Sequence, residues 1–581
     1  MSLLSTVKMS QLPHKIPDSK SWMKNWPPGV PFSIKYPLLP LYELLRNSAR
    51  KYPHKTAIVF YSLEISYQEL DITTDAFAAA LYRMGVRKGD RVALFLPNIP
   101  QFVISFYGAL KAGAIITTMS PLREGAELGF ELLDSGAETL IALDILFENV
   151  QDIVKTSKVT NTIVTNVSDY LPLLRRILAP LRGIKSKKFS NTHNFSELVL
   201  NDKQKPPQID IDPINDTAII QYTGGTTGKP KGAMLTHYNL VANAIQVDRW
   251  ARGWGFSQKN RERILPSTLC VIPFFHIYGL TVALNHGIFT GSKLILIPRF
   301  DVDEILKAIK KYRPSEFPAI PRFYSALLDH PDINKFDFKF FQHCISGASS
   351  LPKDVIHRFK NLTGEDIIEG YGLTEAGPVV LCNPVDPSLR KIGSVGIPYP
   401  DTDSRIVDLE IGEFELSPRE EGELEIRGPQ VMKGYWNKHK ETENVFHDGW
   451  LKTGDIAFMD EDGYFYIVDR KVDTIIRSGF RIIPIEVEKT LLSHPSVLEV
   501  AVVGIPDPYR CTTDVKAFVI LKKDEKNSVT ESELIRFCQE RLEKFKVPGK
   551  IEFREDLPKN STGKVWRRIL REESTQMAEN M

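Results

Sequence analysis

The sequence predicts an α/β protein with a large N-terminal domain of doubly wound sheets and a smaller C-terminal domain. Apolar runs of strand length alternate with stretches of helix length, which is the pattern of parallel sheets covered by helices. The chain has 581 residues, several times the usual domain size of about 100–200 residues, so more than one domain is expected. After a charged segment at 469–473, the rest of the chain has a β/α pattern of its own, which indicates a separate C-terminal unit.

The elements follow from this alternation in chain order. The first fifty residues are rich in Pro and Trp, and they are expected to wrap the surface until a helix at 41–51. The spacing of apolar residues then predicts five elements. They are a strand at 56–60, a helix at 66–84, a strand at 91–96, a helix at 99–112 and a strand at 115–119. A polar connector at 437–450 precedes a hairpin-like turn at 460–464.

Composition excludes several classes of protein. Lys plus Arg number 74 and Asp plus Glu 72, so no large basic field favours nucleic acid. Five cysteines stand far apart without metal-ligand spacing, which is typical of a reduced, cytosolic chain without structural zinc. The charged N-terminus argues against a signal peptide. The most apolar stretch, 102–121, contains Lys111 and favours a buried helix leading into a strand. A soluble, cytoplasmic protein is expected.

One segment, Arg175–Lys188, mixes leucine and isoleucine with basic side chains. It contains six of them: Arg175, Arg176, Arg182, Lys185, Lys187 and Lys188. One interpretation is a patch that lies on an anionic membrane at the cytoplasmic face. The other is a solvated surface excursion, since Pro172 and Pro180 argue against one long helix. Both interpretations stay open at this point.

The strongest local signal is the glycine- and threonine-rich run 222–232, which follows an apolar strand at 218–220. Glycines let several backbone N–H groups point into one concavity, hydroxyls add donors, and two lysines add positive charge, a composition that suits a phosphate. The P-loop pattern GxxxxGK[ST] does not fit. Gly224 and Gly228 stand one residue too close together, and Lys229 is followed by Pro230.

Further segments accompany this loop in a fixed order. They are Ser66–Leu70, Gly89–Val92, Lys111–Gly113, Pro273–Gly279, Ser346–Ala348, Glu369–Glu375, Tyr435, Thr453–Asp455, Asp469–Arg470, Ser478–Gly479 and Pro558–Lys564. With this ordered set, nearly the whole chain resembles the AMP-forming adenylate synthetases, and most of all their long-chain fatty acid–CoA ligases. The resemblance implies a β subdomain within the large domain and a small, mobile C-terminal domain. It implies an N-terminal adenylation domain at 1–469, a hinge at 470–473 and a C-terminal domain at 474–581.

The resemblance also implies a nucleotide site that takes ATP and Mg²⁺. Its phosphate loop would be Thr223, Gly224, Gly225, Thr226, Thr227, Gly228 and Lys231. Further nucleotide-binding positions would be Gly347, Ala348, Glu369, Gly370, Tyr371, Gly372, Thr374, Asp455 and Arg470. In this set Tyr371 would stack on adenine, Asp455 would accept the ribose hydroxyls, and Arg470 would support the ribose. Glu375 and Thr223 would lie at the metal, since a carboxylate is a hard oxygen ligand that suits Mg²⁺.

Catalytic roles follow from the same resemblance. Lys564 would enter the active site on the C-terminal loop, bind ATP there and stabilise the negative charge of the transition state. Thr374 would contact the α-phosphate, and Glu375 would act through the metal. His276 would orient the carboxylate rather than act as a base, because a carboxylic acid is already ionised at pH 7.

The expected activity is the conversion of a medium- to long-chain fatty acid to acyl-AMP with release of pyrophosphate, followed by transfer to coenzyme A. Apolar segments at 275–280, 318–324 and 379–382 favour an alkyl or aryl acid over acetate. Two alternatives stay open: an aryl-acid CoA ligase of the coumarate type, and an acyl-AMP ligase that loads a carrier protein. Chain length preference and a homodimer are not decided by the sequence.

Coenzyme A is implied to pass beside Ser478 and Gly479, where the absence of a Cβ leaves room for the pantetheine arm. Two positions depart from the family pattern. The hinge has Val472 in place of the usual Asp or Lys, and Cys511–Thr512 replaces the usual Gly-Glu pair. These departures leave adenylation untouched and bear on the thioester step.

Overall fold

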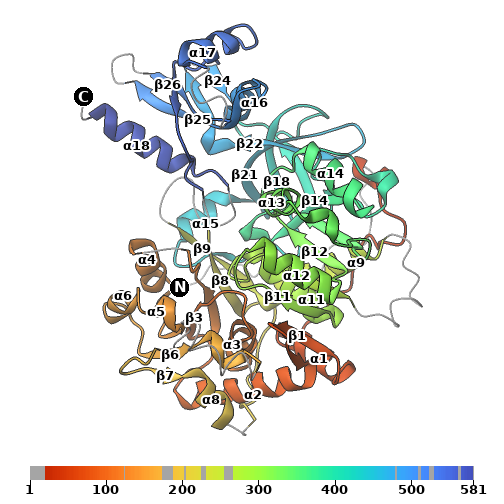
Figure 1. The fold of residues 1–581 in the computed structure, drawn as a ribbon, viewed down its shortest axis with the longest axis vertical. Helices are drawn as coiled ribbons and strands as arrows, with labels where there is room; N and C mark the ends of the chain where they lie inside the picture. The colour runs from red at the N-terminus through yellow and green to blue at the C-terminus, as the bar shows by residue number, and fades with distance from the viewer. Residues whose placement is uncertain are drawn as a thin grey trace.

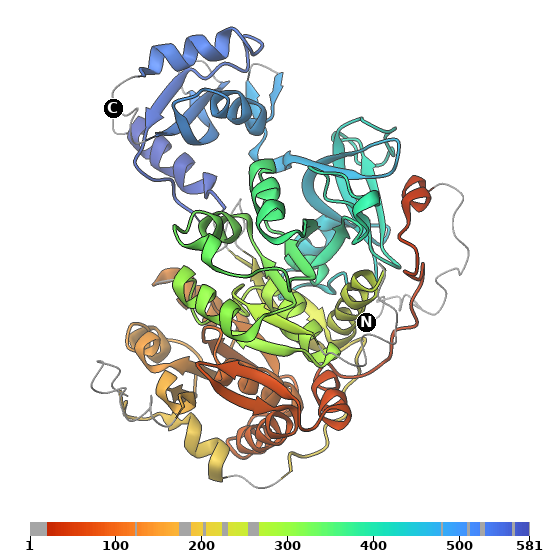
Figure 2. The same ribbon diagram turned by 45° about the vertical axis from the view of Figure 1, so that its right-hand side comes forward.

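The computed structural model describes residues 20–122, 125–172, 187–201, 205–223, 230–253, 266–477, 480–507, 512–522, 529–559 and 564–579. It is an α/β protein with a large N-terminal body and a small C-terminal unit (Figures 1 and 2). The predicted fold class is confirmed, and each of the early predicted elements is present within two residues of its predicted ends.

The first large sheet has eight strands. In spatial order they are β7 (His193–Asn194), β6 (Asn161–Thr165), β5 (Thr139–Leu143), β3 (Arg91–Phe95), β4 (Ile115–Thr118), β8 (Thr217–Thr223), β9 (Lys231–Thr236) and β19 (Gly434–Tyr435). The first six neighbouring strands in this order run parallel; β9 pairs antiparallel with the last of these six, and β19 pairs antiparallel with β9. The edge formed by β8, β9 and β19 faces the site described below.

The second large sheet has nine strands with a parallel centre. In spatial order they are β16 (Ile397–Pro398), β15 (Val379–Cys382), β14 (Ile367–Gly372), β13 (His343–Ser346), β12 (Glu316–Ala319), β10 (Ser267–Cys270), β11 (Lys293–Leu296), β1 (Thr56–Phe60) and β2 (Leu63–Ser66). A third, antiparallel sheet forms the β subdomain and consists of β17 (Asp403–Val407), β18 (Gly422–Arg427), β21 (Trp450–Met459), β20 (Phe446–His447) and β22 (Phe465–Arg470).

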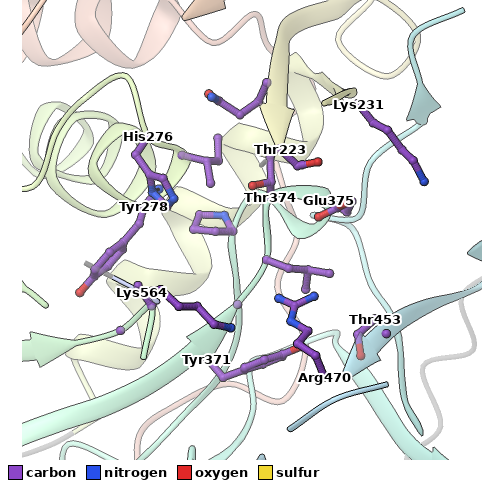
Figure 3. Close-up of a pocket in the computed structure, with 18 of the residues that line it drawn as sticks. Thr223, Lys231, His276, Tyr278, Tyr371, Thr374, Glu375, Thr453, Arg470 and Lys564 are labelled. Atoms are coloured by element: carbon purple, nitrogen blue, oxygen red, sulfur yellow. Dashed lines mark hydrogen bonds between the residues drawn. The ribbon is translucent and has the colours of Figure 1, made fainter. Parts of the chain in front are cut away.

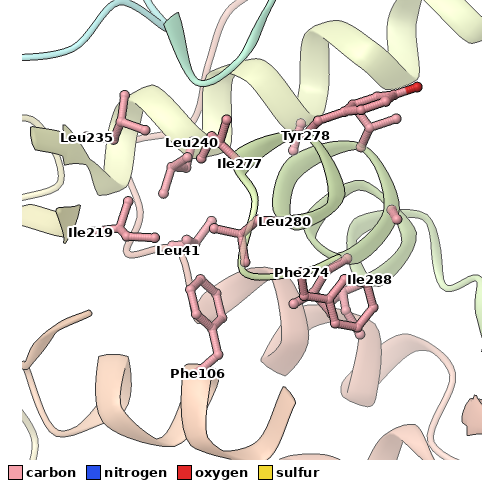
Figure 4. Packing of buried hydrophobic residues seen from close by; sticks show 14 of the residues in the cluster. Leu41, Phe106, Ile219, Leu235, Leu240, Phe274, Ile277, Tyr278, Leu280 and Ile288 are labelled. Atoms are coloured by element: carbon pink, nitrogen blue, oxygen red, sulfur yellow. The ribbon is translucent and has the colours of Figure 1, made fainter. Parts of the chain in front are cut away.

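Helices cover the two large sheets and meet between them. They are α1 (Glu43–Lys51), α2 (Tyr67–Arg83), α3 (Pro100–Lys111), α4 (Ala126–Ser135), α5 (Asp144–Phe147), α6 (Gln151–Lys155), α8 (Phe195–Asn201), α9 (His237–Ala251), α11 (His286–Thr290), α12 (Val302–Tyr312), α13 (Pro321–Leu328), α14 (Lys353–Thr363) and α15 (His439–Val445). Figure 4 shows the junction, where Phe106 of α3, Leu240 of α9 and Leu280 of the π-helix η4 (Gly279–Asn285) pack against one another. This core fixes η4 and the segment before it, which carries His276.

Capping residues explain where the helices begin. The Ser66 hydroxyl accepts the Glu69 N–H while the Glu69 carboxylate accepts the Ser66 N–H, which satisfies two N-terminal donors of α2 at once. Thr236 and Asn239 form the same reciprocal pair at α9. Because Thr236 ends β9, this cap also sets the angle between the sheet edge and α9.

The C-terminal unit has its own apolar core. It contains β23 (Ile475–Arg477), β24 (Phe480–Ile482), α16 (Pro484–Leu492), β25 (Val497–Asp507), β26 (Thr512–Leu521), α17 (Glu531–Gln539), β27 (Lys550–Phe553) and α18 (Arg567–Glu579). The buried residues of its two hydrophobic clusters all lie between Ile475 and Leu570. A short 3₁₀ turn, η8 (Lys471–Asp473), joins it to β22.

Among the helices that the structure describes, none combines the length and the apolar character needed to cross a bilayer. Most of the basic segment 175–188 lies outside the described residues; of its six basic side chains, only Lys187 and Lys188 are described. Lys187 forms an ion pair with Glu148.

Candidate active site

A cavity of about 1270 Å³ lies where the two large sheets, the β subdomain and the C-terminal unit meet. Residues of β8, β14, the β21–β22 region and the segment 564–572 all line it. Figure 3 shows side chains from these distant parts of the chain converging on one space. The sequence-predicted positions Thr223, Lys231, His276, Gly347, Ala348, Gly370, Tyr371, Gly372, Thr374, Glu375, Arg470 and Lys564 all line this cavity.

One side of the cavity, here called the phosphate wall, consists of Thr223, Lys231, Glu375 and Tyr435. Thr223 at the end of β8 pairs with Lys231 at the start of β9, and Tyr435 of β19 pairs with Ala233 of β9. Backbone pairing therefore fixes the positions of three of these four residues. The loop between Thr223 and Lys231, with the predicted Gly224, Gly225, Thr226, Thr227 and Gly228, lies outside the described residues.

Tyr435 connects Glu375 and Lys231 of the phosphate wall. Its hydroxyl donates a hydrogen bond to Glu375 Oε1 at 2.7 Å, and Lys231 Nζ lies 5.1 Å from the centroid of its ring. Burial and the neighbouring Glu375 raise the pKa of Tyr435, so the phenol stays protonated and remains a donor. In the sequence Tyr435 stands out only as part of a motif, because its hydrogen-bond partner lies sixty residues away in the chain, beyond the reach of local patterns.

The phosphate wall offers oxygen atoms that could bind a metal ion, but it offers few of them. Figure 3 shows Thr223, Thr374 and Glu375 close together. Within the described part of the chain, no group of three or more His, Cys, Asp or Glu residues is placed to hold a metal ion. Mg²⁺ is usually bound through one or two carboxylates together with substrate phosphates. Glu375 and Thr223 fit that kind of site and do not fit an all-protein metal cage.

The β14 segment contributes its backbone and one ring to the cavity. A Cβ on Gly372 would lie 2.1 Å from the Pro378 carbonyl oxygen, so glycine is required there for contact within the protein itself. Glu369, predicted to be a nucleotide-binding residue, does not line the cavity. Its buried carboxylate accepts the N–H groups of Leu351 and Gly393 at 3.2 and 3.3 Å. Here the carboxylate connects the middle of β14 to two loops.

Tyr371, Asp455 and Arg470 form one hydrogen-bonded group. The Tyr371 hydroxyl donates to Asp455 Oδ2, and Arg470 Nε lies 2.6 Å from Asp455 Oδ1. Burial and the Asp455 carboxylate hold the pKa of Tyr371 well above its ordinary value, so Tyr371 is the donor. The antiparallel register of β21 and β22 pairs Asp455 with Arg470 and so creates the ion pair. Asp455 itself lies behind Tyr371 and Arg470 and does not line the cavity surface.

His276 and an apolar chamber lie on the side opposite Lys231. The Tyr278 N–H donates to His276 Nδ1 at 3.2 Å, so a neutral His276 carries its proton on Nε2. Beyond His276 the cavity is lined by apolar and weakly polar side chains: Val247, Tyr278, Val282, Ile345, Val379, Cys382 and Tyr399. The predicted apolar segments 275–280 and 379–382 contribute to this chamber. Segment 318–324 instead lines a separate void of about 10 Å³ behind His276 and Tyr278.

Lys564 reaches the cavity from the C-terminal unit. Figure 3 shows its side chain extending toward Tyr371 and Arg470, with His276 and Tyr278 on its other side. Burial and the nearby Arg470 charge lower the pKa of Lys564, while Asp455 acts in the opposite direction. Arg470 and Lys564 together are here called the hinge wall. The predicted coenzyme A positions Ser478 and Gly479 lie outside the described residues.

Comparison with known proteins places this geometry in context. The sequence model of the AMP-binding enzyme family matches residues 45–436, and that of the AMP-binding enzyme C-terminal domain matches residues 486–564. A long-chain-fatty-acid–CoA ligase from Bacillus subtilis is 44% identical over 96% of this chain and 98% of its own length. A ligase of the same name from Yersinia pestis is 36% identical over 96% of this chain and 99% of its own.

Solved structures have the same fold. ATP-bound MatB from Rhodopseudomonas palustris superimposes with a TM-score of 0.78 at 28% identity, covering 93% of this chain and all of its own. A fatty acyl CoA synthetase from Mycobacterium tuberculosis gives a TM-score of 0.71 at 28% identity, with 93% of this chain and 99% of its own covered.

Proposed function

This chain belongs to the AMP-binding enzyme family, and we propose that it is a long-chain fatty acid–CoA ligase. It activates the acid with ATP to acyl-AMP and pyrophosphate, and then transfers the acyl group to coenzyme A. One observation carries the proposal: Lys564 of the C-terminal unit meets Tyr371, Thr374 and Glu375 in a cavity that continues into an apolar chamber. Curated relatives that match almost end to end carry the same name.

The phosphate wall is proposed to hold the triphosphate. Lys231 supplies a positive charge, and the Thr223 and Thr374 hydroxyls supply hydrogen-bond donors. Mg²⁺ is proposed to bind beside Glu375 and Thr223, where, once bound, it would neutralise charge on the phosphates. Glu375 already has one oxygen fixed by Tyr435, which orients the carboxylate before the nucleotide arrives.

The hinge wall is proposed to act on the reacting atoms. In the first step a carboxylate oxygen of the fatty acid attacks the α-phosphorus, a new O–P bond forms, and the bond to the leaving pyrophosphate breaks. The Lys564 ammonium can contact both the carboxylate and the α-phosphate as negative charge gathers between them. His276, with its proton on Nε2, can donate to the carboxylate and orient it. No base is needed, because the acid is already ionised at neutral pH.

Tyr371 and Asp455 are proposed to bind the adenosine. The Tyr371 ring lines the cavity and can stack on adenine. Asp455 Oδ1 and Oδ2 are engaged by Arg470 and Tyr371, and a carboxylate has about four acceptor sites. The two remaining sites are proposed to bind the ribose hydroxyls after Tyr371 and Arg470, which cover Asp455 in this structure, shift aside. In this arrangement Arg470 fixes the orientation of Asp455.

The apolar chamber is proposed to take the acyl chain. Ligand pockets in proteins usually measure about 300–1000 Å³. The cavity of about 1270 Å³ exceeds that range, as expected for a site that holds a nucleotide and a second substrate together. The chamber wall formed by Val247, Val282 and Val379 presents no charge and favours an alkyl chain over a polar acid.

The thioester step is proposed to use a second position of the C-terminal unit, reached by rotation about a hinge at 470–473. Lys564 would then leave the site, and the segment with Ser478 and Gly479 would face it. The division into an adenylation domain at 1–469 and a C-terminal domain at 474–581 is part of this proposal. The separate apolar core of the C-terminal unit supports it.

Pyrophosphate release measured over acetate, octanoate, palmitate and 4-coumarate tests the proposal, with and without Mg²⁺. Palmitate should give the fastest release, removal of Mg²⁺ should abolish it, and palmitoyl-CoA should appear only when coenzyme A is added. Faster release with 4-coumarate would favour the aryl-acid alternative. Acyl-AMP that accumulates without thioester formation would favour a ligase that serves a carrier protein.

The segment 175–188 is proposed to contact anionic membranes reversibly. Six basic side chains interleaved with Leu and Ile support this, since each basic residue near an anionic surface contributes about 1 kcal/mol. Replacing Arg175, Arg176, Lys187 and Lys188 by Gln should weaken binding to phosphatidylserine vesicles, and high salt should do the same. Binding that neither change alters would contradict the proposal.

A further inference from the structure

The guanidinium of Arg567 lies among three buried carboxylates at the hinge. Arg567 is the first residue of α18, three positions after Lys564. It donates to both oxygens of Glu488 at 2.9 Å, to Asp469 Oδ1 at 3.3 Å and to Asp473 Oδ2 at 3.2 Å. The Asp469 and Asp473 side chains are only 4% and 2% exposed. Charged hydrogen bonds removed from water in this way are strong and directional.

The three carboxylates belong to different parts of the molecule: Asp473 lies in the turn η8 of the hinge, and Asp469 and Glu488 lie before and after it in the chain. Glu488 lies on α16, and α18 packs through Leu570 on the apolar core of the same C-terminal unit. The Arg567–Glu488 pair is therefore internal to that unit. Asp469 lies on β22, whose backbone pairs with β21 in the β subdomain at Ile456. The Arg567–Asp469 bond consequently connects the C-terminal unit to the body across the hinge.

Asp469 makes a second bond of the same kind. Its Oδ2 accepts the N–H of Ile485 at 3.1 Å, in the first turn of α16, where backbone N–H groups lack partners within the helix. Two elements of the C-terminal unit, α16 and α18, thus attach to one carboxylate of the body. Because Arg567 begins the helix that directly follows Lys564, the place where Arg567 binds also sets the place of Lys564.

We propose that Asp469 and Arg567 are positioning residues that hold the C-terminal unit where Lys564 reaches the cavity, and that their bond breaks when the unit rotates for the thioester step. Glu488 keeps Arg567 oriented in both positions, since that pair does not cross the hinge. Asp469 therefore supports acyl-AMP formation and plays no part in thioester formation. The inference rests on the proposed function for its substrates, but its contacts do not depend on which acid is used.

The test measures the rates of both half-reactions for the Asp469→Asn variant and for the Glu488→Gln variant, with one preparation of each protein used for both rates. Asp469→Asn keeps an oxygen for the Ile485 N–H but loses the charge that faces Arg567. We expect acyl-AMP formation from palmitate and ATP to slow by about tenfold, the effect of one charge-assisted hydrogen bond. Conversion of supplied palmitoyl-AMP and coenzyme A should stay within about twofold of the wild type. Glu488→Gln should lower both rates to the same extent, because it weakens the C-terminal unit itself.

Asp469→Glu is the conservative variant. It restores the charge on a longer arm and should recover part of the lost adenylation rate. If Asp469→Asn does not fold, as judged by circular dichroism, the rates of acyl-AMP formation and of thioester formation are compared in Asp469→Glu instead. A selective loss of acyl-AMP formation in that variant would support the inference. Equal losses in both half-reactions for Asp469→Asn, or the same selective loss for Glu488→Gln, would overturn the inference.

Limited trypsin digestion provides a readout that needs no substrate. Lys471 lies in the hinge and pairs with Glu423 of the body at 2.7 Å. Loss of the Asp469 bond should speed cleavage at the hinge by several-fold, whereas unchanged cleavage would count against the inference. A wild-type protein that forms no palmitoyl-AMP would instead contradict the proposed function, and the digestion result would still judge the hinge contacts.

Discussion

The phosphate wall and the hinge wall face the same cavity but are held by different forces. Thr223, Lys231 and Tyr435 lie on strands whose backbones pair with one another. Lys564 lies beyond the proposed hinge, on a unit that attaches to the body through charged side chains. Arg470, at the start of the hinge, still pairs with Asp455 in the ladder of β21 and β22. The hydrogen bonds between paired strands are hard to rearrange, whereas a charged side chain can leave its partner and bind another charged group or water. The difference indicates which groups stay in place through a reaction cycle and which are able to leave.

Replacing Lys564 by Ala should give the largest effect and sharpens the comparison most. We expect acyl-AMP formation to lose about 3–4 kcal/mol of transition-state stabilisation, the usual cost of removing one group that stabilises developing charge. Thioester formation from supplied acyl-AMP should be nearly unchanged. The measurement is single-turnover kinetics of each half-reaction. Loss of both steps would mean that the two walls act in one fixed arrangement.

On the phosphate wall, Tyr435→Phe removes the hydroxyl that orients Glu375 and keeps the ring below Lys231. Loss of a hydrogen bond to a charged group should weaken the Mg²⁺-dependent binding of ATP by about 1.5–3 kcal/mol. The Mg²⁺ concentration required for ATP binding should therefore rise. Tyr435→Leu also removes the ring, and it should weaken ATP binding without Mg²⁺ as well. Calorimetric ATP titrations with and without Mg²⁺ separate the two contacts. Identical behaviour of the two variants would show that the ring contact with Lys231 contributes nothing and that only the hydroxyl matters.

The body also responds to acid at a defined residue, His237. It is 2% exposed, and its Nδ1 accepts the Leu41 N–H at 3.0 Å. Burial lowers the pKa of His237 to about 4. The unfolded chain therefore binds a proton at His237 more readily than the folded chain does. The buried, neutral His237 makes its full contribution to the stability of the fold above about pH 6.5, and this contribution declines as the pH falls toward 4.

Between pH 7 and pH 5 the loss from His237 should amount to about 1–2 kcal/mol of unfolding free energy. His237→Asn keeps an acceptor for Leu41 and cannot take up the proton, so its stability should fall less over this range. Urea unfolding at both pH values measures the difference. A parallel decline in the two proteins would assign the acid sensitivity to other groups.

The smallest effect is expected from Arg568, the neighbour of Arg567. Its Nη2 lies 3.8 Å from Glu127 Oε1 of α4, and the two side chains are 27% and 33% exposed. Solvent-exposed pairs contribute about 0–1 kcal/mol, so Arg568→Gln should change adenylation by less than about threefold. A tenfold loss, comparable to that expected for Asp469→Asn, would mean that exposed as well as buried ion pairs hold the hinge wall.

Several residues that line the cavity were predictable because their positions depend on short segments. Thr374 and Glu375 follow a strand in one motif, and the sequence places both at the cavity. The helix at 66–84 was predictable for a similar reason: its capping residues and its apolar spacing are local. The contacts of Glu369 were not predictable, because its carboxylate bonds to loops eighteen and twenty-four residues away. The hydrogen bond between Tyr435 and Glu375 likewise depends on which strand lies beside β9.

By itself the sequence determined the α/β class, the order of the early elements, the family and twelve of the residues that line the cavity, because apolar spacing, capping and motifs act over a few residues. Only the tertiary structure decided that Tyr435 orients Glu375, that Tyr371 and Arg470 cover Asp455, and that Arg567 connects Glu488 with Asp469. Each of these depends on strand register or on the docking of one unit against another. Such contacts join residues far apart in the chain, and they form only when the packed cores bring their backbones together.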